Sequence, residues 1–282
     1  MKEKFSVITH KTAHFMRGLV GGRYDSERFT SFSPKLNRQV VVDVLKPHHI
    51  NGSAYPLLIL NDGQDADALQ LKYTAERLWH RGDILPVLIV CVHEGDRMQE
   101  YGVASEKDFA GRGSRAGAYA DFILNELLPY LRGKYPIDSK QQAIAGFSLG
   151  ALSAIDIGWN NAQEFKKIGA FSGSFWWRRK DSAAVDFDEK IHRIMHSQIR
   201  DGAWQDGLKF WFQTGTKDEP FDRNGNGVID SIDDTLDLIA ELTKKGYRPF
   251  HDIVYHEMPG GEHNQHTWAQ AMPVFLKWAF PA

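Results

Sequence analysis

Short apolar segments alternate with segments of helical spacing along most of the chain, and this alternation limits the fold more than any other feature. The apolar segments predict strands at residues 55–60, 86–92, 142–147, 165–172, 208–214 and 252–257. Helical spacing predicts helices at residues 66–81, 115–132, 149–159, 233–245 and 266–279. Strands that alternate with helices form a mainly parallel sheet with helices on both faces. We therefore expect an α/β protein with one domain over residues 1–282.

Three further segments complete this pattern. Residues 4–9 and 38–45 alternate in hydropathy and predict strands near the start of the chain. Residues 186–200 predict a helix between two strands of the sheet. The surrounding segment, 178–205, is the natural place for a small cap over a site at the strand ends.

The pentapeptide Gly146-Phe-Ser-Leu-Gly150 joins an expected strand to an expected helix. A serine in the pattern G-x-S-x-G at such a turn is typical of the nucleophile elbow of α/β-hydrolases. The sharp turn requires strained φ and ψ angles at Ser148, and side chains at the two glycine positions would collide with the neighbouring strand and helix. The alternative is a loop of small residues that contains a serine by chance.

An acid and a histidine follow the serine in the order that an α/β-hydrolase uses, each just past an expected strand. Asp218 comes after strand 208–214, and His263 comes after strand 252–257. In this arrangement His263 takes the Ser148 proton as Oγ attacks an ester carbonyl, and the acid orients the imidazole. The neighbouring Glu219 remains an alternative acid.

An oxyanion intermediate needs two backbone N–H donors. Leu149, the residue after the nucleophile, supplies one of them. The turn Asn61-Asp-Gly-Gln-Asp65 follows an apolar strand, and Gln64 is the candidate for the second, with Gly63 permitting a close backbone approach. The same turn also fits an ordinary helix start with Asp65 as the N-cap, and both interpretations can hold together.

Several segments together resemble the putative esterase family of α/β-hydrolases. They are Ser33-Pro-Lys-Leu-Asn-Arg38, Asn61-Asp-Gly-Gln64, Ala145-Gly-Phe-Ser-Leu-Gly150, Phe171-Ser-Gly-Ser-Phe-Trp-Trp177 and Gly260-Gly-Glu-His-Asn264 with Trp268. That family includes S-formylglutathione hydrolase, feruloyl esterases and enterobactin-type siderophore esterases. The resemblance implies hydrolysis of a carboxylic ester through an acyl-enzyme. The family usually has Leu-Asp-Gly where this chain has Asn61-Asp-Gly.

Candidate substrate contacts lie near the expected site. Trp176 and Trp177 follow one strand and fit an acyl or aromatic pocket, and Arg97 and Tyr101 follow another. Packing beneath the cap is an equal alternative for the aromatic residues. Solvent exposure or internal ion pairing is the commoner role of such an arginine.

A second motif begins four residues after Asp218. Residues 222–233 fit the twelve-residue calcium loop of EF-hands, with Gly227 at the sharp turn. The oxygen ligands would be Asp222, Asn224, Asn226, the Val228 carbonyl, Asp230 and Asp233. A helix is expected to follow, but no helix precedes the loop, and position 12 is Asp where EF-hands have Glu. We expect a structural Ca²⁺ that braces the acid loop, against the alternative of a metal-free turn, and no organic cofactor.

Composition excludes several functional classes. Lys and Arg total 34 and Asp and Glu total 36, so the formal charge of −2 gives no basic excess for binding nucleic acid or a membrane surface. Cys91 is the single cysteine, in an apolar segment that predicts a buried thiol. No segment has the pattern of a signal peptide or membrane span, so a cytoplasmic location is the default expectation.

The expected substrate is a small-molecule or carbohydrate-linked ester, and the oligomeric state stays open. Feruloyl or acetyl esterase, siderophore trilactone esterase and S-formylglutathione-type thioesterase are alternatives within the enzyme class. A non-catalytic carbohydrate- or partner-binding relative is the alternative from another class, although such proteins typically lose the serine or the histidine. A calcium-regulated module is a third interpretation, and it depends on residues 222–233 alone.

Overall fold

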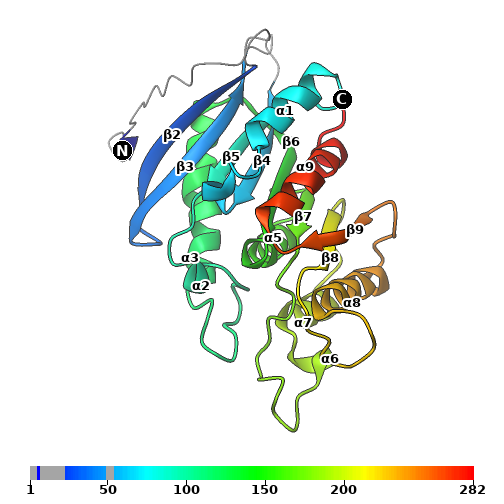
Figure 1. The fold of residues 1–282 in the computed structure, drawn as a ribbon. Helices are drawn as coiled ribbons and strands as arrows, with labels where there is room; N and C mark the ends of the chain where they lie inside the picture. Colours follow the sequence, from blue (N-terminus) through cyan, green and yellow to red (C-terminus); the bar gives the residue numbers. More distant parts are fainter. Residues whose placement is uncertain (1–4, 7–22, 49–53) are drawn as a thin grey trace.

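One nine-stranded sheet runs through the computed structural model, which describes residues 5–6, 23–48 and 54–282. The strand order is β1-β2-β3-β5-β4-β6-β7-β8-β9 (Figure 1). The strands are β1 (Phe5–Ser6), β2 (Tyr24–Ser33), β3 (Arg38–Pro47), β4 (Tyr55–Asn61), β5 (Leu88–Val92), β6 (Ile137–Phe147), β7 (Lys167–Phe171), β8 (Lys209–Lys217) and β9 (Ile253–Glu262). The pairs β1–β2, β2–β3 and β3–β5 are antiparallel. All later pairs in this order, from β5–β4 to β8–β9, are parallel. The expected α/β-hydrolase sheet is therefore confirmed.

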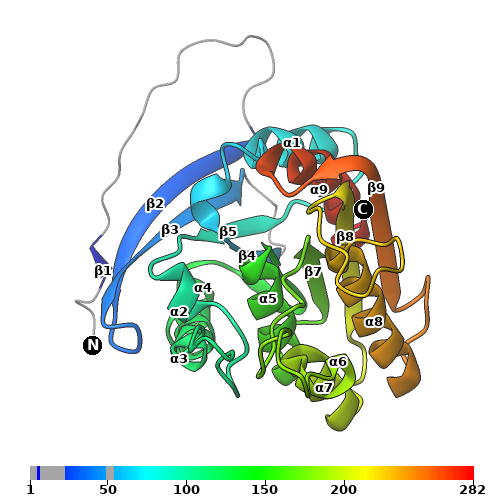
Figure 2. The ribbon, with the colours of Figure 1, turned by 60° about the horizontal axis from the view of Figure 1, so that its bottom comes forward.

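Helices cover both faces of this sheet (Figure 2). They are α1 (Leu71–His80), α2 (Arg97–Glu100), α3 (Ala116–Asp121), α4 (Leu128–Lys134), α5 (Leu149–Asn160), α6 (Glu189–His192), α7 (Ile194–Asp201), α8 (Asp230–Lys245) and α9 (Gln265–Ala279). A short 3₁₀ segment, η1 (Gly63–Asp65), and a π-helical segment, η2 (Phe122–Leu127), complete them. Helices α1 and α9 lie together on one face, and α3, α4, α5, α7 and α8 lie on the other (Figure 2).

The central strands are apolar on both faces, and successive side chains enter different cores. Leu58 and Leu60 of β4 pack in the core beneath α1 and α9. Leu57 and Ile59 of the same strand pack in the core beneath α3, α4 and α5. This alternation follows from the two-residue period of a strand, and it explains why the strand has no polar position until Asn61.

Several elements differ from the sequence-based expectation. Strand β2 was not predicted, because its exposed positions are mostly polar and its buried ones include serine. The helix expected at 66–81 begins at Leu71, after the η1 turn. The expected helix at 115–132 includes the π-helical η2 and ends at Lys134.

The expected cap helix at 186–200 is two short helices, α6 and α7, separated at Arg193, whose backbone is extended (φ −76°, ψ 114°). Helix α7 packs against α8, and Arg178 forms a β-bridge with Arg193. The cap role of 178–205 stays a prediction. Of the strand expected at 4–9, only Phe5–Ser6 lies within the described residues. No helix in the described ranges has the length and apolar character needed to cross a bilayer.

Candidate active site

Ser148 occupies a strained turn between β6 and α5. Its φ of 56° and ψ of −119° lie outside the regions that most residues adopt. Its N–H donates to the Phe171 carbonyl at 2.9 Å, which fixes the turn against β7. A Cβ at Gly146 would collide with the backbone of Gly150, and a Cβ at Gly150 would collide with the Asp62 carboxylate. The structure therefore has the strain and the close contacts that the pentapeptide predicts.

The Ser148 hydroxyl has a neighbour that sequence reasoning missed. Its Oγ lies 3.2 Å from the Oγ of Ser174, and the Ser174 N–H donates to the Ser148 carbonyl at 3.1 Å. Ser174 is buried, whereas Ser148 is half-buried and accessible to a ligand. The segment that follows β7 thus contacts the Ser148 hydroxyl directly.

Asp218 and His263 follow paired strands. Lys217 of β8 pairs with Glu262 of β9, so the next residue of each strand is a member of the predicted triad. Strand β9 runs five residues past the expected end at 257, and His263 therefore stands directly at the strand end. Parallel strands bring their carboxyl ends to the same edge of the sheet, which is where α/β proteins hold their ligands.

The Asp218 carboxylate is buried and only partly satisfied. Its Oδ2 accepts a hydrogen bond from the Gly215 N–H at 3.0 Å, and its Oδ1 is buried without a hydrogen-bond partner. Burial raises the pKa of Asp218, while the Gly215 N–H, the Ser172 hydroxyl and the charge of His263 act to lower it. Glu219 is half-buried, and burial followed by repulsion from Asp230 raises its pKa.

The His263 ring packs edge-on against Trp268, with ring centroids 5.3 Å apart at an interplanar angle of 77°. His263 as a residue is exposed, but desolvation of its ring by the surrounding protein lowers its pKa, the Asp218 charge raises it and the Arg97 charge lowers it, with a net decrease. A neutral imidazole at neutral pH is the form that a general base requires. Among the residues that the structure describes, the ring has no hydrogen-bond partner.

Two other histidines near the end of the chain lie outside this arrangement. His256 is within β9 and stacks on Trp211, and His266 is in α9, where it contacts Gln270 at 2.8 Å. A further contact joins α9 to the segment that follows β7: the Trp268 Nε1–H donates to the Ser172 Oγ at 3.0 Å.

The two predicted oxyanion donors open two different helical turns. Leu149 begins α5, so its N–H is among those that have no acceptor within the helix. Gln64 is the second residue of η1. This turn begins directly after Asp62, whose backbone is left-handed (φ 60°). A Cβ at Gly63 would collide with the backbone of Cys91, which explains the glycine there. Asp65 is not the cap of α1, whose N-cap residue is Gln70.

The four predicted substrate contacts occupy different environments. Trp176 is half-buried, and the Arg112 guanidinium lies 4.7 Å from its ring centroid. Trp177 and Tyr101 are fully buried, which gives them packing positions in this structure. Arg97 is partly exposed, and its Nε contacts Asp62 at 3.0 Å and Glu94 at 2.9 Å.

Behind the serine lies a buried polar network that sequence reasoning did not identify. The Asn61 Nδ2–H donates to the Gly150 carbonyl, and the Tyr119 hydroxyl donates to Asn61 Oδ1, both at 2.7 Å. The Asp62 N–H donates to the Tyr101 hydroxyl at 3.0 Å, and burial raises the Asp62 pKa to about 7. The only sequence signal for this network was the polar pair that ends the apolar strand β4.

The predicted calcium loop is organised by its own hydrogen bonds. The Asp222 carboxylate accepts from the N–H groups of Gly225, Asn226 and Gly227. The Asn224 and Asn226 amides donate to Asp233 Oδ2 at 2.9 and 2.7 Å, so positions 3, 5 and 12 converge.

The rest of the loop differs from the expected arrangement. Asp230 accepts from the Arg223 N–H and begins α8, three residues before the expected helix start at Asp233. Among the described residues, no three Asp, Glu, His or Cys side chains are grouped to hold a metal ion.

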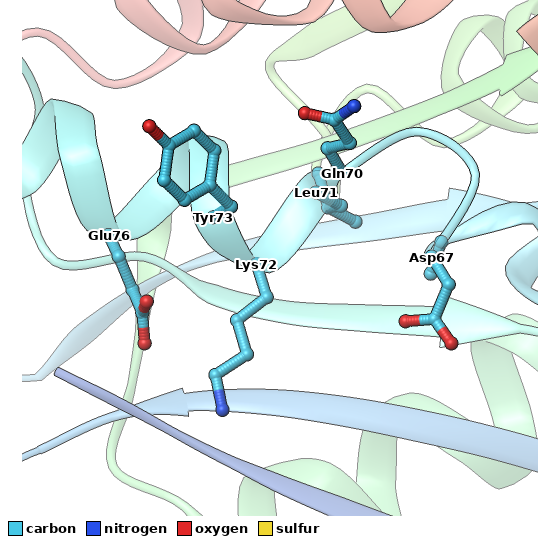
Figure 3. Close-up of a pocket in the computed structure, with 7 residues that line it drawn as sticks. Asp67, Gln70, Leu71, Lys72, Tyr73 and Glu76 are labelled. Carbon is cyan, nitrogen blue, oxygen red and sulfur yellow. The ribbon is translucent and has the colours of Figure 1, made fainter. Parts of the chain in front are cut away.

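A pocket of about 650 Å³ lies elsewhere, along α1 and the loop before it (Figure 3). Its lining includes Asp67, Gln70, Lys72, Tyr73 and Glu76, which belong to neither the elbow nor the acid and histidine loops. The Lys72 Nζ donates to Ser26 Oγ of β2 at 3.2 Å, so this hollow lies beside the antiparallel edge of the sheet. It contains none of the predicted site residues.

Comparison with known proteins gives the same assignment of fold. The model of the family described as "Putative esterase" matches residues 33–279. The enterobactin esterase of Shigella flexneri superposes with a TM-score of 0.71 at 19% identity, over 90% of this chain and 58% of that chain. A ferulic acid esterase gives 0.68 at 19% identity, over 93% of this chain and 99% of that chain. An IroE-like serine hydrolase from Shewanella oneidensis gives 0.66 at 20% identity, over 90% and 80%.

At these identities the structural likeness establishes a shared fold, and this chain spans less than two thirds of the length of the enterobactin esterase. The family model, in contrast, covers most of the sequence, from before β3 to the end of α9. This chain belongs to the putative esterase family of α/β-hydrolases.

Proposed function

We propose that this protein is a serine esterase that cleaves a carboxylic ester through Ser148, His263 and Asp218. The observation that carries the proposal is the strained turn at Ser148, together with an acid and a histidine that directly follow the paired strands β8 and β9. Membership of an esterase family is consistent with this chemistry. The lowered pKa of His263 supports a neutral imidazole at neutral pH, which is the form that acyl transfer requires of the base.

In the proposed mechanism, a ring nitrogen of His263 takes the proton from Ser148 Oγ as Oγ bonds to the ester carbonyl carbon. The tetrahedral oxyanion accepts hydrogen bonds from the N–H groups of Leu149 and Gln64. It collapses to an acyl-enzyme, and the protonated His263 gives its proton to the leaving alcohol. Water then attacks the acyl-enzyme with His263 again as base, which releases the acid and restores Ser148. Asp218 stabilises the imidazolium in both halves of the reaction.

The surroundings of Trp176 favour a small ester that carries an aromatic or anionic group. Arg112 lies over the Trp176 ring and pairs with the buried Asp108, and Arg178 lies 5.6 and 5.8 Å from the ring centroids of Phe109 and Phe187. The Arg178 Nε is buried without a hydrogen-bond partner. Enterobactin and ferulic acid esters, named in the related structures, are substrates of this kind. A siderophore trilactone and a feruloyl ester are therefore the two leading candidates, ahead of an S-formylglutathione-type thioester.

Inactivation of the nucleophile tests the proposal. Ser148→Ala should abolish hydrolysis of p-nitrophenyl acetate and labelling by a fluorophosphonate probe, while circular dichroism and the Tm show a folded protein. Ser105→Ala, at an exposed serine away from the elbow, is the matched control and should retain full activity. Undiminished turnover of Ser148→Ala would refute the proposal. Absence of labelling and turnover in the unmodified protein would favour a non-catalytic binding relative.

We also propose that residues 222–233 bind a structural Ca²⁺. The convergence of Asn224, Asn226 and Asp233 supports the proposal, because these are three of the ligand positions of the EF-hand pattern. The two asparagine amides would have to turn their oxygens inward, and Asp230 would have to leave Arg223.

Calcium should raise the Tm of the full chain, and Asp233→Ala should remove that increase. Magnesium at the same concentration is the control ion. A Tm that is insensitive to calcium would refute the metal site. A reversible change in turnover at constant Tm would instead favour regulation by calcium.

A further inference from the structure

We propose that Asn61 is a positioning residue that fixes the spacing between the two oxyanion amides, an inference that rests on the proposed function. The amides belong to separate segments of the chain: Gln64 follows β4, and Leu149 begins α5. Both N–H groups must point at the same oxygen for either to be fully effective. A direct link between the two segments would set their separation.

The hydrogen bond from the Asn61 Nδ2–H to the Gly150 carbonyl is such a link. It is 2.7 Å long and buried, and it joins residues 89 apart in the chain. Asn61 precedes Gln64 by a short, tightly packed turn, in which Gly63 lies against the backbone of Cys91. Gly150 directly follows Leu149 in the first turn of α5. The bond therefore connects the two amide-bearing segments close to the amides themselves.

Tyr119 determines which end of the Asn61 amide faces α5. The Tyr119 hydroxyl donates to Asn61 Oδ1 at 2.7 Å, which leaves Nδ2–H to meet the Gly150 carbonyl. Tyr119 is fully buried and packs edge-on against Tyr101, with centroids 5.1 Å apart. Since Asn61 and Tyr119 have no exposed surface, loss of either hydrogen bond leaves a polar group unsatisfied in the core.

Asp62 supplies a second connection between the same segments. Its carboxylate lies against Gly150 and accepts from Arg97 Nε at 3.0 Å. Arg97 Nη2 donates to the Phe147 carbonyl at 3.1 Å. The elbow is thus held at the carbonyls of Phe147 and Gly150, on either side of Ser148 and Leu149. Asn61 is uncharged, so its replacement by an apolar residue leaves the charges near the site unchanged.

The test variant is Asn61→Leu, which keeps a similar size but removes the donor. Removal of a whole oxyanion donor costs about 10²- to 10³-fold in kcat, so a displaced one should cost roughly 10- to 100-fold. The loss should fall on kcat with p-nitrophenyl acetate, and KM should change by less than about twofold, because the amides bind charge that develops in the transition state. Affinity for a boronic acid, which mimics the tetrahedral adduct, should fall by a similar factor.

Tyr119→Phe provides a second variant that should fold even where Asn61→Leu does not. It removes only the bond that orients Asn61, so we expect the same split between kcat and KM with a smaller loss, about two- to tenfold. Tyr135→Phe, at a tyrosine that donates to Glu27 beside the antiparallel edge of the sheet, is the matched control and should have unchanged kcat.

The outcomes separate the two proposals. A lower Tm with unchanged kcat and boronate affinity in both variants would overturn the positioning role and leave the esterase proposal intact. If Ser148→Ala keeps full turnover, the esterase proposal fails, and the role of Asn61 fails with it. A loss of kcat in both variants, in the expected order and with KM preserved, would support the inference.

Discussion

The two halves of the candidate active site are held in different ways. The half that contains the nucleophile and the oxyanion turn is joined by buried hydrogen bonds, among them those of Asn61, Tyr119 and Arg97. In the other half the backbone is also held, for example by the bond from the Gly260 N–H to Thr216 Oγ1 at 2.8 Å, but the two proposed side chains are less connected. Asp218 accepts from the Gly215 N–H, and the His263 ring packs against Trp268. From this difference we expect the proposed oxyanion site to be preorganised, and the proposed acid and base to complete their contacts when a substrate is bound.

Removal of the base should have the largest effect on the less connected half. We expect His263→Ala to lower kcat for p-nitrophenyl acetate by about 10⁴-fold or more, because no other group can accept the Ser148 proton. Steady-state kinetics at neutral pH measures the loss. His266→Ala, three residues further on and exposed, is the matched control and should leave kcat within about twofold. Comparable losses in both variants would contradict the assignment of the base.

Replacement of the acid should have the next largest effect. It should also show whether Asp218 or its neighbour Glu219 is the acid. Asp218→Asn should lower kcat by roughly 10³- to 10⁴-fold, because the amide cannot stabilise the imidazolium. Glu219→Gln should change kcat by less than about twofold, since its carboxylate faces the start of α8, where Ser231 and Asp230 influence its pKa. The reverse order of the two losses would make Glu219 the acid.

The sequence indicates which side chains are candidates for the chemistry, but it does not indicate which contacts hold them in place. Ser148, Asp218 and His263 can be proposed from the sequence because each follows a recognisable apolar strand and because their order is that of an α/β-hydrolase; their roles stay a prediction. Strand β2 could not, because at the antiparallel edge it faces solvent and its apolar positions are few.

The polar network was also beyond sequence reasoning. Asn61 and Tyr119 are 58 residues apart, and neither hydropathy nor spacing indicates that two such side chains meet. In the sequence, Asn61 is a minor departure from a family motif. In the structure its side chain is fully buried and donates a hydrogen bond to the Gly150 carbonyl. Contacts of this kind depend on how strands and helices pack, which a one-dimensional pattern does not encode.

Loss of the hydrogen bond between Trp268 and Ser172 should have a moderate effect. Trp268→Phe keeps a ring beneath His263 but removes the Nε1–H that donates to Ser172. We expect a loss of about three- to tenfold in kcat, because the Ser172 hydroxyl, which helps to lower the Asp218 pKa, is no longer held. Trp278→Phe, on the same helix but away from the site, is the control. Equal effects on both variants would assign the loss to packing alone.

The smallest expected effect concerns Arg97, whose positive charge in the nucleophile half acts on His263 in the other half. The pKa of His263 lies below its ordinary value of 6.5, and Arg97 contributes to the decrease. The neutral base is active, so kcat/KM should rise with pH and reach half its maximum below pH 6.5. Arg97→Gln removes a positive charge that disfavours the imidazolium, and the His263 pKa should therefore increase. The acid limb of the profile should therefore move to higher pH.

The direction of this shift separates an electrostatic role of Arg97 from a purely structural one. Loss of the Asp62 and Phe147 contacts would lower the rate at every pH, but it would not move the midpoint of the acid limb. Arg132→Gln, which removes an ion pair with Glu164 far from the elbow, should leave the midpoint unchanged. A midpoint that stays in place or moves to lower pH in Arg97→Gln would show that the nucleophile half does not act on the base through charge. The two halves would then be coupled through the substrate alone.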